Sequence, residues 1–115
     1  MKRISSPDAA QIHHRERSDA GSFVIERDGA RIAEIGYVIE RAPQRPPRAI
    51  VNHTFVAKAL RGQGIGQELV RTLAQWAARN AIELVAVCPF ARAVLAENPQ
   101  LGRQGAIAQA GGARL

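Results

Sequence analysis

The hydrophobic pattern of the chain changes its period at Gly64. Before this glycine, residues 50–56 are rich in β-branched side chains, as in a buried strand. After it, Leu69, Leu73 and Trp76 recur at the four- and three-residue spacing of an amphipathic helix. A strand that leads through a glycine-rich loop into a helix therefore constrains the fold more than any other feature of the sequence.

Two further strands are expected before this unit. Residues 23–26 and 32–39 are rich in apolar side chains, and residues 27–30 between them contain the Asp-Gly pair that is typical of a tight hairpin turn. Residues 41–48 carry three prolines, none of which can donate a backbone hydrogen bond to a sheet. We therefore predict a loop over residues 41–48.

The remaining pattern predicts one more strand and one more helix. The amphipathic helix is expected to end at Asn80, and residues 82–87 are typical of a strand. Pro89 is a favoured first residue for a short helix, which should stop before Pro99. This order predicts an α+β fold (an α/β sandwich) in which a mixed, mostly antiparallel sheet contains one strand–helix–strand crossover.

The 115 residues fit a single small domain. Residues 1–21 are polar and lack a sustained period, so we predict a polar N-terminal arm there. Residues 22–99 hold all the predicted elements and form the domain. Residues 100–115 are rich in glycine and poor in apolar side chains, which predicts a tail.

Charge and composition narrow the functional classes. The net charge of +6 invites a nucleic-acid interpretation, but the densest basic group is only Arg41, Arg45 and Arg48, so a solvated basic surface is favoured. The single cysteine, Cys88, excludes an internal disulfide, and no Cys/His spacing predicts a metal site. No apolar run approaches the ~20 residues of a membrane span, and no signal peptide is visible. We therefore expect a cytoplasmic protein without a membrane partner.

The loop at residues 61–66 (Arg-Gly-Gln-Gly-Ile-Gly) has the composition of a phosphate site. The first turn of a helix offers about four unpaired backbone N–H groups and a partial positive charge. Glycine lets an anion approach the backbone, and Arg61 adds a guanidinium group. Gln67 stands where a P-loop needs lysine, and the glycines lack the spacing of a dinucleotide fingerprint. The loop predicts a diphosphate site of another kind, and its spacing alone also fits a turn without a ligand.

This loop resembles the acetyl-CoA motif of GCN5-related N-acetyltransferases, the GNAT superfamily. The motif is Arg/Gln-x-x-Gly-x-Gly/Ala, and the arginine and the last two glycines of residues 61–66 match it. The His-Thr pair at residues 53–54 and Cys-Pro-Phe at residues 88–90 are similar to the short YjdJ-type N-acetyltransferase domains. The resemblance covers residues 22–99 and implies a GNAT-like domain.

The resemblance also implies where acetyl-CoA is held. The backbone at Phe55 and Val56 would pair with the pantetheine arm, and Cys88 would line the gap between parting strands that receives the thioester. The pyrophosphate would be held by the backbone N–H groups of Arg61, Gly62, Gln63, Gly64, Ile65 and Gly66.

Acetyl transfer needs a base for the amine proton and is helped by an acid for the thiolate. His53 is the candidate base, and Cys88 is a candidate acid or acetyl-accepting nucleophile. Each also has a structural interpretation, as a strand histidine and as a small core residue. Glu34 and Glu40 are alternative bases, whereas Tyr37 is expected to pack in the core.

Two positions depart from the pattern of the relatives. Val94 stands where a tyrosine usually protonates the departing thiolate, and Asn98 replaces a histidine before Pro99. The leading hypothesis is an acetyl-CoA-dependent N-acetyltransferase that acts by direct transfer to an amine. The alternatives are a CoA or acyl-CoA binding module with little activity and, third, a basic nucleic-acid-binding domain. The acceptor is unassigned, with a protein acceptor and a homo-oligomer both left open.

Overall fold

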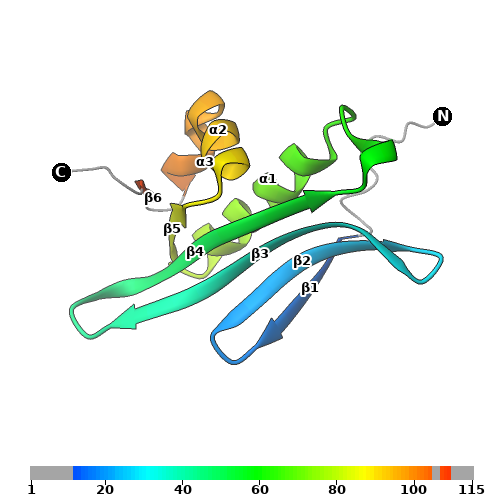
Figure 1. Ribbon diagram of the computed structural model, residues 1–115. Helices are drawn as coiled ribbons and strands as arrows, with labels where there is room; N and C mark the ends of the chain where they lie inside the picture. The colour runs from blue at the N-terminus through cyan, green and yellow to red at the C-terminus, as the bar shows by residue number, and fades with distance from the viewer. Residues whose placement is uncertain (1–11, 105–106, 110–115) are drawn as a thin grey trace.

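The computed structural model describes residues 12–104 and 107–109, which form one mixed sheet with helices against it (Figure 1). The strands, in their order across the sheet, are β1 (Ile12–Arg17), β2 (Ala20–Arg27), β3 (Ala30–Ala42), β4 (Arg45–Val56), β5 (Glu83–Ala86) and β6 (Ile107–Gln109). The helices are α1 (Ile65–Arg79), α2 (Pro89–Glu97) and α3 (Pro99–Gln104), and the short 3-10 helix η2 (Lys58–Leu60) follows β4. Strands β1 to β4 pair antiparallel, whereas β5 is parallel to β4 and to β6. The predicted α+β fold and its crossover, β4–α1–β5, are confirmed.

The hairpin predicted between the second and third strands is also confirmed. Asp28 and Gly29 have φ angles of 53° and 80°. Positive φ at both central positions of a two-residue turn is the requirement of a type I′ hairpin, whose twist matches that of the flanking strands.

The loop predicted over residues 41–48 is wrong. Strand β3 continues to Ala42 and β4 begins at Arg45, so only residues 43–44 form the turn. Strand β5 pairs with β4 only from Arg48 onward. The prolines at residues 46–47 therefore lie where no strand of the described chain pairs with β4 on its β5 side, and a missing N–H donor is tolerated at such an edge.

The arm predicted over residues 1–21 is wrong from Ile12 onward. Residues 12–17 form β1, an edge strand paired with β2 from Ile12↔Ile25 to Arg17↔Ala20. The strand was hidden in the sequence because Ile12 is its only aliphatic residue and the next residue on the same side is His14. Residues 1–11 lie outside the described part of the chain.

The tail predicted over residues 100–115 is wrong at its start. Helix α3 follows α2 at once, and Leu101 is only 3% exposed and belongs to the main core cluster. A single buried leucine among polar and glycine residues gives no helical period, so this helix carried no sequence signal. Strand β6 adds residues 107–109 to the sheet, and the rest of the tail is outside the described residues.

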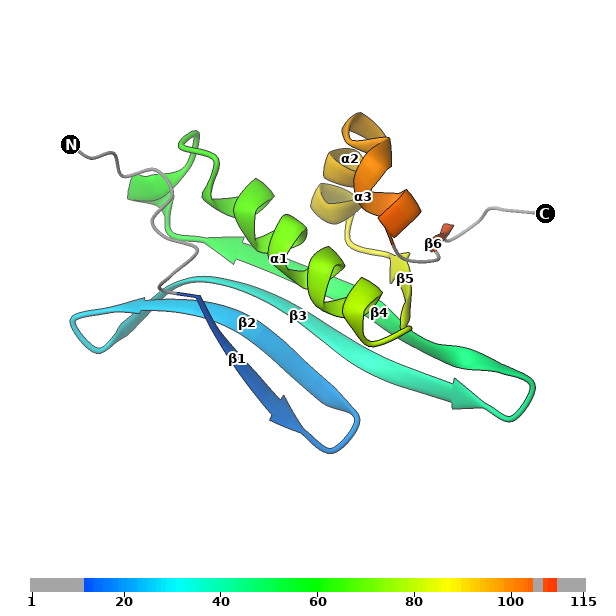
Figure 2. The ribbon, with the colours of Figure 1, turned by 180° about the vertical axis from the view of Figure 1, so that it is seen from behind.

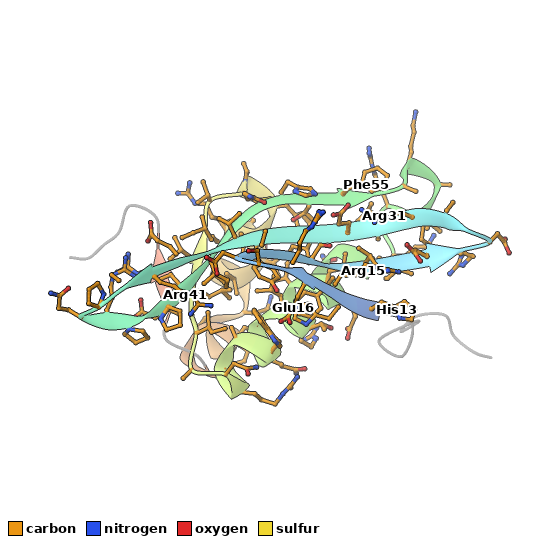
Figure 3. The ribbon with its side chains drawn as sticks, turned by 90° about the horizontal axis from the view of Figure 1, so that it is seen from below. His13, Arg15, Glu16, Arg31, Arg41 and Phe55 are labelled. Atoms are coloured by element: carbon orange, nitrogen blue, oxygen red, sulfur yellow. The ribbon has the colours of Figure 1, made fainter. Side chains whose placement is uncertain are left out.

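The core lies between the sheet and α1. Leu69 and Leu73 of α1 and Ile35 and Val51 of the sheet are each at most 1% exposed. Figures 1 and 2 show α1, α2 and α3 on the same side of the sheet. The opposite face, hereafter the open face, carries no helix among the described residues (Figure 3).

None of the described helices is long and apolar enough to span a membrane.

An aromatic cluster of His14, Phe23, Tyr37 and Trp76 holds β1 to the core. The His14 ring stacks on Phe23 with centroids 4.1 Å apart and meets Trp76 edge-on at 4.8 Å, and its Nε2 atom lies 2.7 Å from the Tyr37 hydroxyl oxygen. Burial raises the pKa of Tyr37 to about 12, with a smaller contribution from the charge of Glu16. Burial lowers the pKa of His14 below 6.5, and the carboxylate of Glu16, 3.7 Å away, partly opposes this shift.

We expect the free energy of unfolding to fall as the pH drops below 6.5, because the unfolded chain then binds a proton on His14 that the folded chain binds less readily. His14→Gln should flatten this pH dependence, measured by denaturant unfolding at neutral pH and at about pH 5. His13→Gln, on the exposed side of the same strand, is the matched control and should keep the parent's pH dependence. Equal flattening in both variants would contradict the assignment to His14.

Candidate functional site

A pocket of about 430 Å³ opens where β4 ends and α1 begins. Its walls come from two parts of the chain, the stretch that runs from the end of β4 through η2 and the glycine loop to the start of α1, and one residue of α2. The lining residues are Thr54, Phe55, Val56, Leu60, Arg61, Gly62, Gly64, Ile65, Gly66, Gln67 and Phe90. Gln63 belongs to the loop but not to this lining. The structure thus brings the predicted loop and the predicted strand end together at one pocket.

The glycine loop presents free backbone N–H groups to this pocket. Gly62 and Gly64 both have a φ of 83°, and a Cβ on either would meet no atom within 4 Å. The first bond of the helix runs from the Glu68 N–H to the Gly64 carbonyl at 3.0 Å, and no side chain caps the helix. The N–H groups of residues 64–67 therefore have no partner within α1, which is the arrangement that binds phosphate at helix starts.

Arg61 connects this loop to the preceding strand. Its Nε atom donates a hydrogen bond of 3.0 Å to the Val56 carbonyl at the end of β4. The Arg61 guanidinium group, which is expected to face a phosphate, therefore also links the loop to β4. This hydrogen bond fixes the positions of the remaining N–H groups of the guanidinium.

Strands β4 and β5 part beside the pocket. The last paired residues are Val51 and Ala86, after which the Val87 and Cys88 N–H groups both donate to the Val51 carbonyl at 3.0 Å. Strand β4 then continues to Val56, and none of the described strands pairs with this stretch on its β5 side. A gap between these strands is what the family resemblance predicted.

The backbone alternation decides which groups face this gap. The Ala57 N–H donates to the Ile32 carbonyl at 2.8 Å. Hydrogen-bonded pairs recur at every second residue of an antiparallel ladder, so Phe55 and Glu34 are the next hydrogen-bonded pair. The backbone of Phe55 therefore faces β3 and not the gap, contrary to the expectation that it pairs with pantetheine. Thr54 and Val56 face the gap, and the expected role of Val56 stays a prediction.

Cys88 lies at the inner end of the gap. It is 7% exposed and precedes the first residue of α2. Its Sγ atom is 3.3 Å from the Thr54 hydroxyl oxygen, which orients the thiol from the facing strand. Thr54 was recognised only as part of a sequence signature, and no pattern assigned it this contact.

His53, the other candidate catalytic residue, lies on the opposite face of the sheet. Its Nε2 atom is 3.7 Å from a carboxylate oxygen of Glu34, and about half of its side chain is exposed. Neither the hydrogen bonds nor the ion pairs of the described residues join His53 to Cys88. Glu34 is therefore beside the candidate base, whereas Glu40 is bound to Arg45 at 3.0 Å, near the far end of the β3–β4 hairpin.

Phe90 closes one wall of the pocket against the start of α1. A Cβ on Gly66 would lie 2.6 Å from the Phe90 ring, so glycine is needed there for close packing as well as for access to the backbone. Leu60, Gln67 and Phe90 line the pocket without having been predicted as binding residues. The Cys-Pro-Phe sequence shared with the relatives was the only sequence feature that pointed to Phe90. No sequence feature pointed to Leu60 or Gln67.

Parted strands and a helix start with free N–H groups define a domain suited to an extended ligand that carries a pyrophosphate. The sequence matches the family described as GCN5-related N-acetyl-transferase over residues 22–104, and the chain belongs to this family. The narrower likeness to YjdJ-type domains stays a prediction. A comparison with curated protein sequences finds no match.

Solved acetyltransferase structures share the fold. Ribosomal-protein-alanine N-acetyltransferase from Brucella melitensis biovar Abortus 2308 aligns with a TM-score of 0.62 and 20% identity over 86% of this chain and 70% of that chain. Glucosamine-6-phosphate N-acetyltransferase from Arabidopsis thaliana gives 0.60 and 19% over 84% and 65%. Aminoglycoside N-acetyltransferase AAC(6')-Iy in complex with CoA gives 0.52 and 17% over 75% and 69%. This chain spans 65 to 70% of the length of these structures.

No group of three or more potential metal ligands occurs among the residues that the structure describes.

Gly64→Val should abolish the thermal stabilisation by acetyl-CoA, because a β-branched residue is strained at a φ of 83° and its side chain would fill the space beside the free N–H groups. Gly29→Val is the matched control, since Gly29 has a φ of 80° and equally open surroundings in the distant β2–β3 turn. Both variants should lose stability, but only Gly64→Val should lose the ligand-induced shift in a melting assay. Retention of the full shift by Gly64→Val would refute the loop assignment.

Proposed function

We propose that this protein is an acetyl-CoA-dependent N-acetyltransferase that transfers the acetyl group directly to a primary amine within a ternary complex. The observation that carries the proposal is the continuity of the site, in which the glycine-loop pocket reaches along β4 to Thr54, whose hydroxyl contacts Cys88 in the gap between β4 and β5. Family membership and the fold of the solved structures support acyl transfer in general.

The residues present suit a CoA thioester. The N–H groups of residues 64–67 would hold the pyrophosphate, and the backbone groups of Thr54 together with the Val56 N–H would pair with the amides of the pantetheine arm. Phe55 and Phe90 are 41% and 38% exposed at this pocket, which supplies apolar surface for the arm. When bound, the cofactor supplies an activated acetyl group as a thioester.

The reaction forms a C–N bond and breaks the thioester C–S bond, so one proton must leave the amine and one must reach the thiolate. His53, beside Glu34, would accept the amine proton on the open face of the sheet. Cys88, in contact with Thr54, would donate a proton to the departing thiolate from the other side of β4. Strand β4 thus separates the two proton transfers.

A CoA-binding module with little activity remains the second candidate, and one observation favours it. Val94 occupies the position of the usual tyrosine acid and is 3% exposed, so it offers only hydrocarbon to the interior. Cys88 is the remaining proton donor identified at the gap, which makes it the residue that separates the two candidates.

The nucleic-acid hypothesis loses its main support. The three arginines of the densest basic group are engaged in ion pairs, Arg41 with Asp19 at 3.2 Å, Arg45 with Glu40 at 3.0 Å and Arg48 with Glu83 at 2.9 Å. Paired guanidinium groups offer little net charge to a phosphate backbone.

Cys88→Ala should keep the affinity for acetyl-CoA within about threefold, because the glycine loop supplies most of the binding, and should lower thiol release with primary amines by at least about tenfold. Calorimetry measures the binding, and a thiol-specific dye measures the release. Intact mass spectrometry of the active parent separates the two active roles, since an acetyl adduct on Cys88 indicates a nucleophile, whereas no adduct combined with the loss of thiol release in Cys88→Ala indicates an acid.

Thr54→Val serves as the matched control because it removes the contact to the thiol and leaves Cys88 in place. It should lower the turnover less than Cys88→Ala does. Full activity of Cys88→Ala would contradict the proton-donor role, and failure of the parent protein to release thiol with any amine would favour the binding module.

A further inference from the structure

A trough of about 520 Å³ crosses the open face of the sheet, the face shown in Figure 3. The trough runs across the strands, along residues that lie directly opposite one another in neighbouring strands. These are Arg15 and Ser22, Ser22 and Gly36, and Gly36 and His53. The three steps between four strands span about 14 Å at the usual strand spacing. The trough is low in the middle because serine and glycine are small, and it is bounded by longer side chains.

Gly36 explains how His53 lies at one end of the trough. A Cβ on Gly36 would be 2.6 Å from Cε1 and 2.9 Å from Nδ1 of His53, so only glycine lets the imidazole lie across β3. The next residue, Thr54, points to the helix side of the sheet, where its hydroxyl contacts Cys88. The His53 end is therefore the end nearest to the acyl site.

The opposite end of the trough is positively charged. Among the arginines that line it, Arg15 is paired with Glu26 at 2.9 Å and Arg31 with Glu34 at 3.0 Å. No ion pair connects Arg17, on β1, to any residue within the described ranges. The adjacent Glu16 also contributes to the trough lining, but its carboxylate lies 3.7 Å from the His14 imidazole of the aromatic cluster and forms no ion pair with Arg17. Arg17 is thus the trough arginine whose charge no described carboxylate neutralises.

We propose that this trough binds an extended polypeptide acceptor, with its amino terminus at His53 and an acidic side chain at Arg17. The identification rests on the proposed function, which places the reacting amine at the His53 end. A length of about 14 Å accommodates about four extended residues. The trough is an open channel on a sheet face, and small ligands are usually held in concave sites that bury most of their surface. Charge complementarity with Arg17 selects an acidic segment over a basic one.

The test uses two fluorescent hexapeptides that differ only in aspartate or lysine at the fourth and fifth positions. Anisotropy titrations with the full chain, with and without CoA, should show about fivefold tighter binding of the acidic peptide, and this preference should shrink with added salt. Arg17→Glu should reverse the preference. Arg27→Glu carries the same charge change at an exposed position outside the trough and should preserve it. Ser22→Phe should weaken both peptides by filling the trough floor.

Equal affinity for the two peptides, binding of neither, or the same effect of Arg17→Glu and Arg27→Glu would overturn the proposal. A parallel calorimetric titration with acetyl-CoA keeps the two hypotheses apart. If the parent protein does not bind acetyl-CoA, the result counts against the N-acetyltransferase function. The peptide preference, in contrast, tests only the trough.

Discussion

The Val51 carbonyl is the point on which the site depends. It accepts hydrogen bonds from both Val87 and Cys88 at 3.0 Å, and this double acceptance ends the parallel ladder after Ala86. The chain then turns into α2 and leaves β4 to continue alone. Because backbone groups need partners, the N–H groups of Thr54 and Val56, which no described residue pairs, are available to an extended, amide-containing ligand. The same turn places the Cys88 thiol inside the gap.

A bulge in β4 then determines which side chain faces which side. Tyr37 is opposite Val51 and Gly36 is opposite His53, so Asn52 is an extra residue in the ladder. A one-residue shift moves every following side chain to the other face of a strand. Thr54 therefore points to Cys88, whereas His53 is turned to the open face. Without the bulge, His53 would point to the helix side of the sheet, away from the Glu34 carboxylate that it now faces at 3.7 Å.

The sequence predicted those features that depend on local physics. The change of period at Gly64 located α1, and positive φ at Gly62 and Gly64 agrees with the need for glycine in the loop. The bulge could not be predicted, because an extra Asn52 in a β-branched run changes neither the composition nor the apparent alternation enough to be seen. Residues 12–17 were missed because an edge strand buries only one side, and there a histidine takes the place of an aliphatic residue. Phe90 reaches the pocket through tertiary packing on Gly66, which no local pattern encodes.

On the open face, which no described helix covers, apolar side chains must be shielded from solvent in another way. Val24 alternates with the core residues Phe23 and Ile25 and so points to this face, yet it is 0% exposed. Its neighbours across the strands are His13 and Glu34, and the ion pairs Arg15–Glu26 and Arg31–Glu34 lie close by. Exposed ion pairs add little to stability, but the aliphatic stems of long charged side chains cover apolar surface well. Because the charges used in this way neutralise one another, the surroundings of Val24 carry two ion pairs and little net charge, whereas Arg17 of β1 forms no ion pair with any described residue.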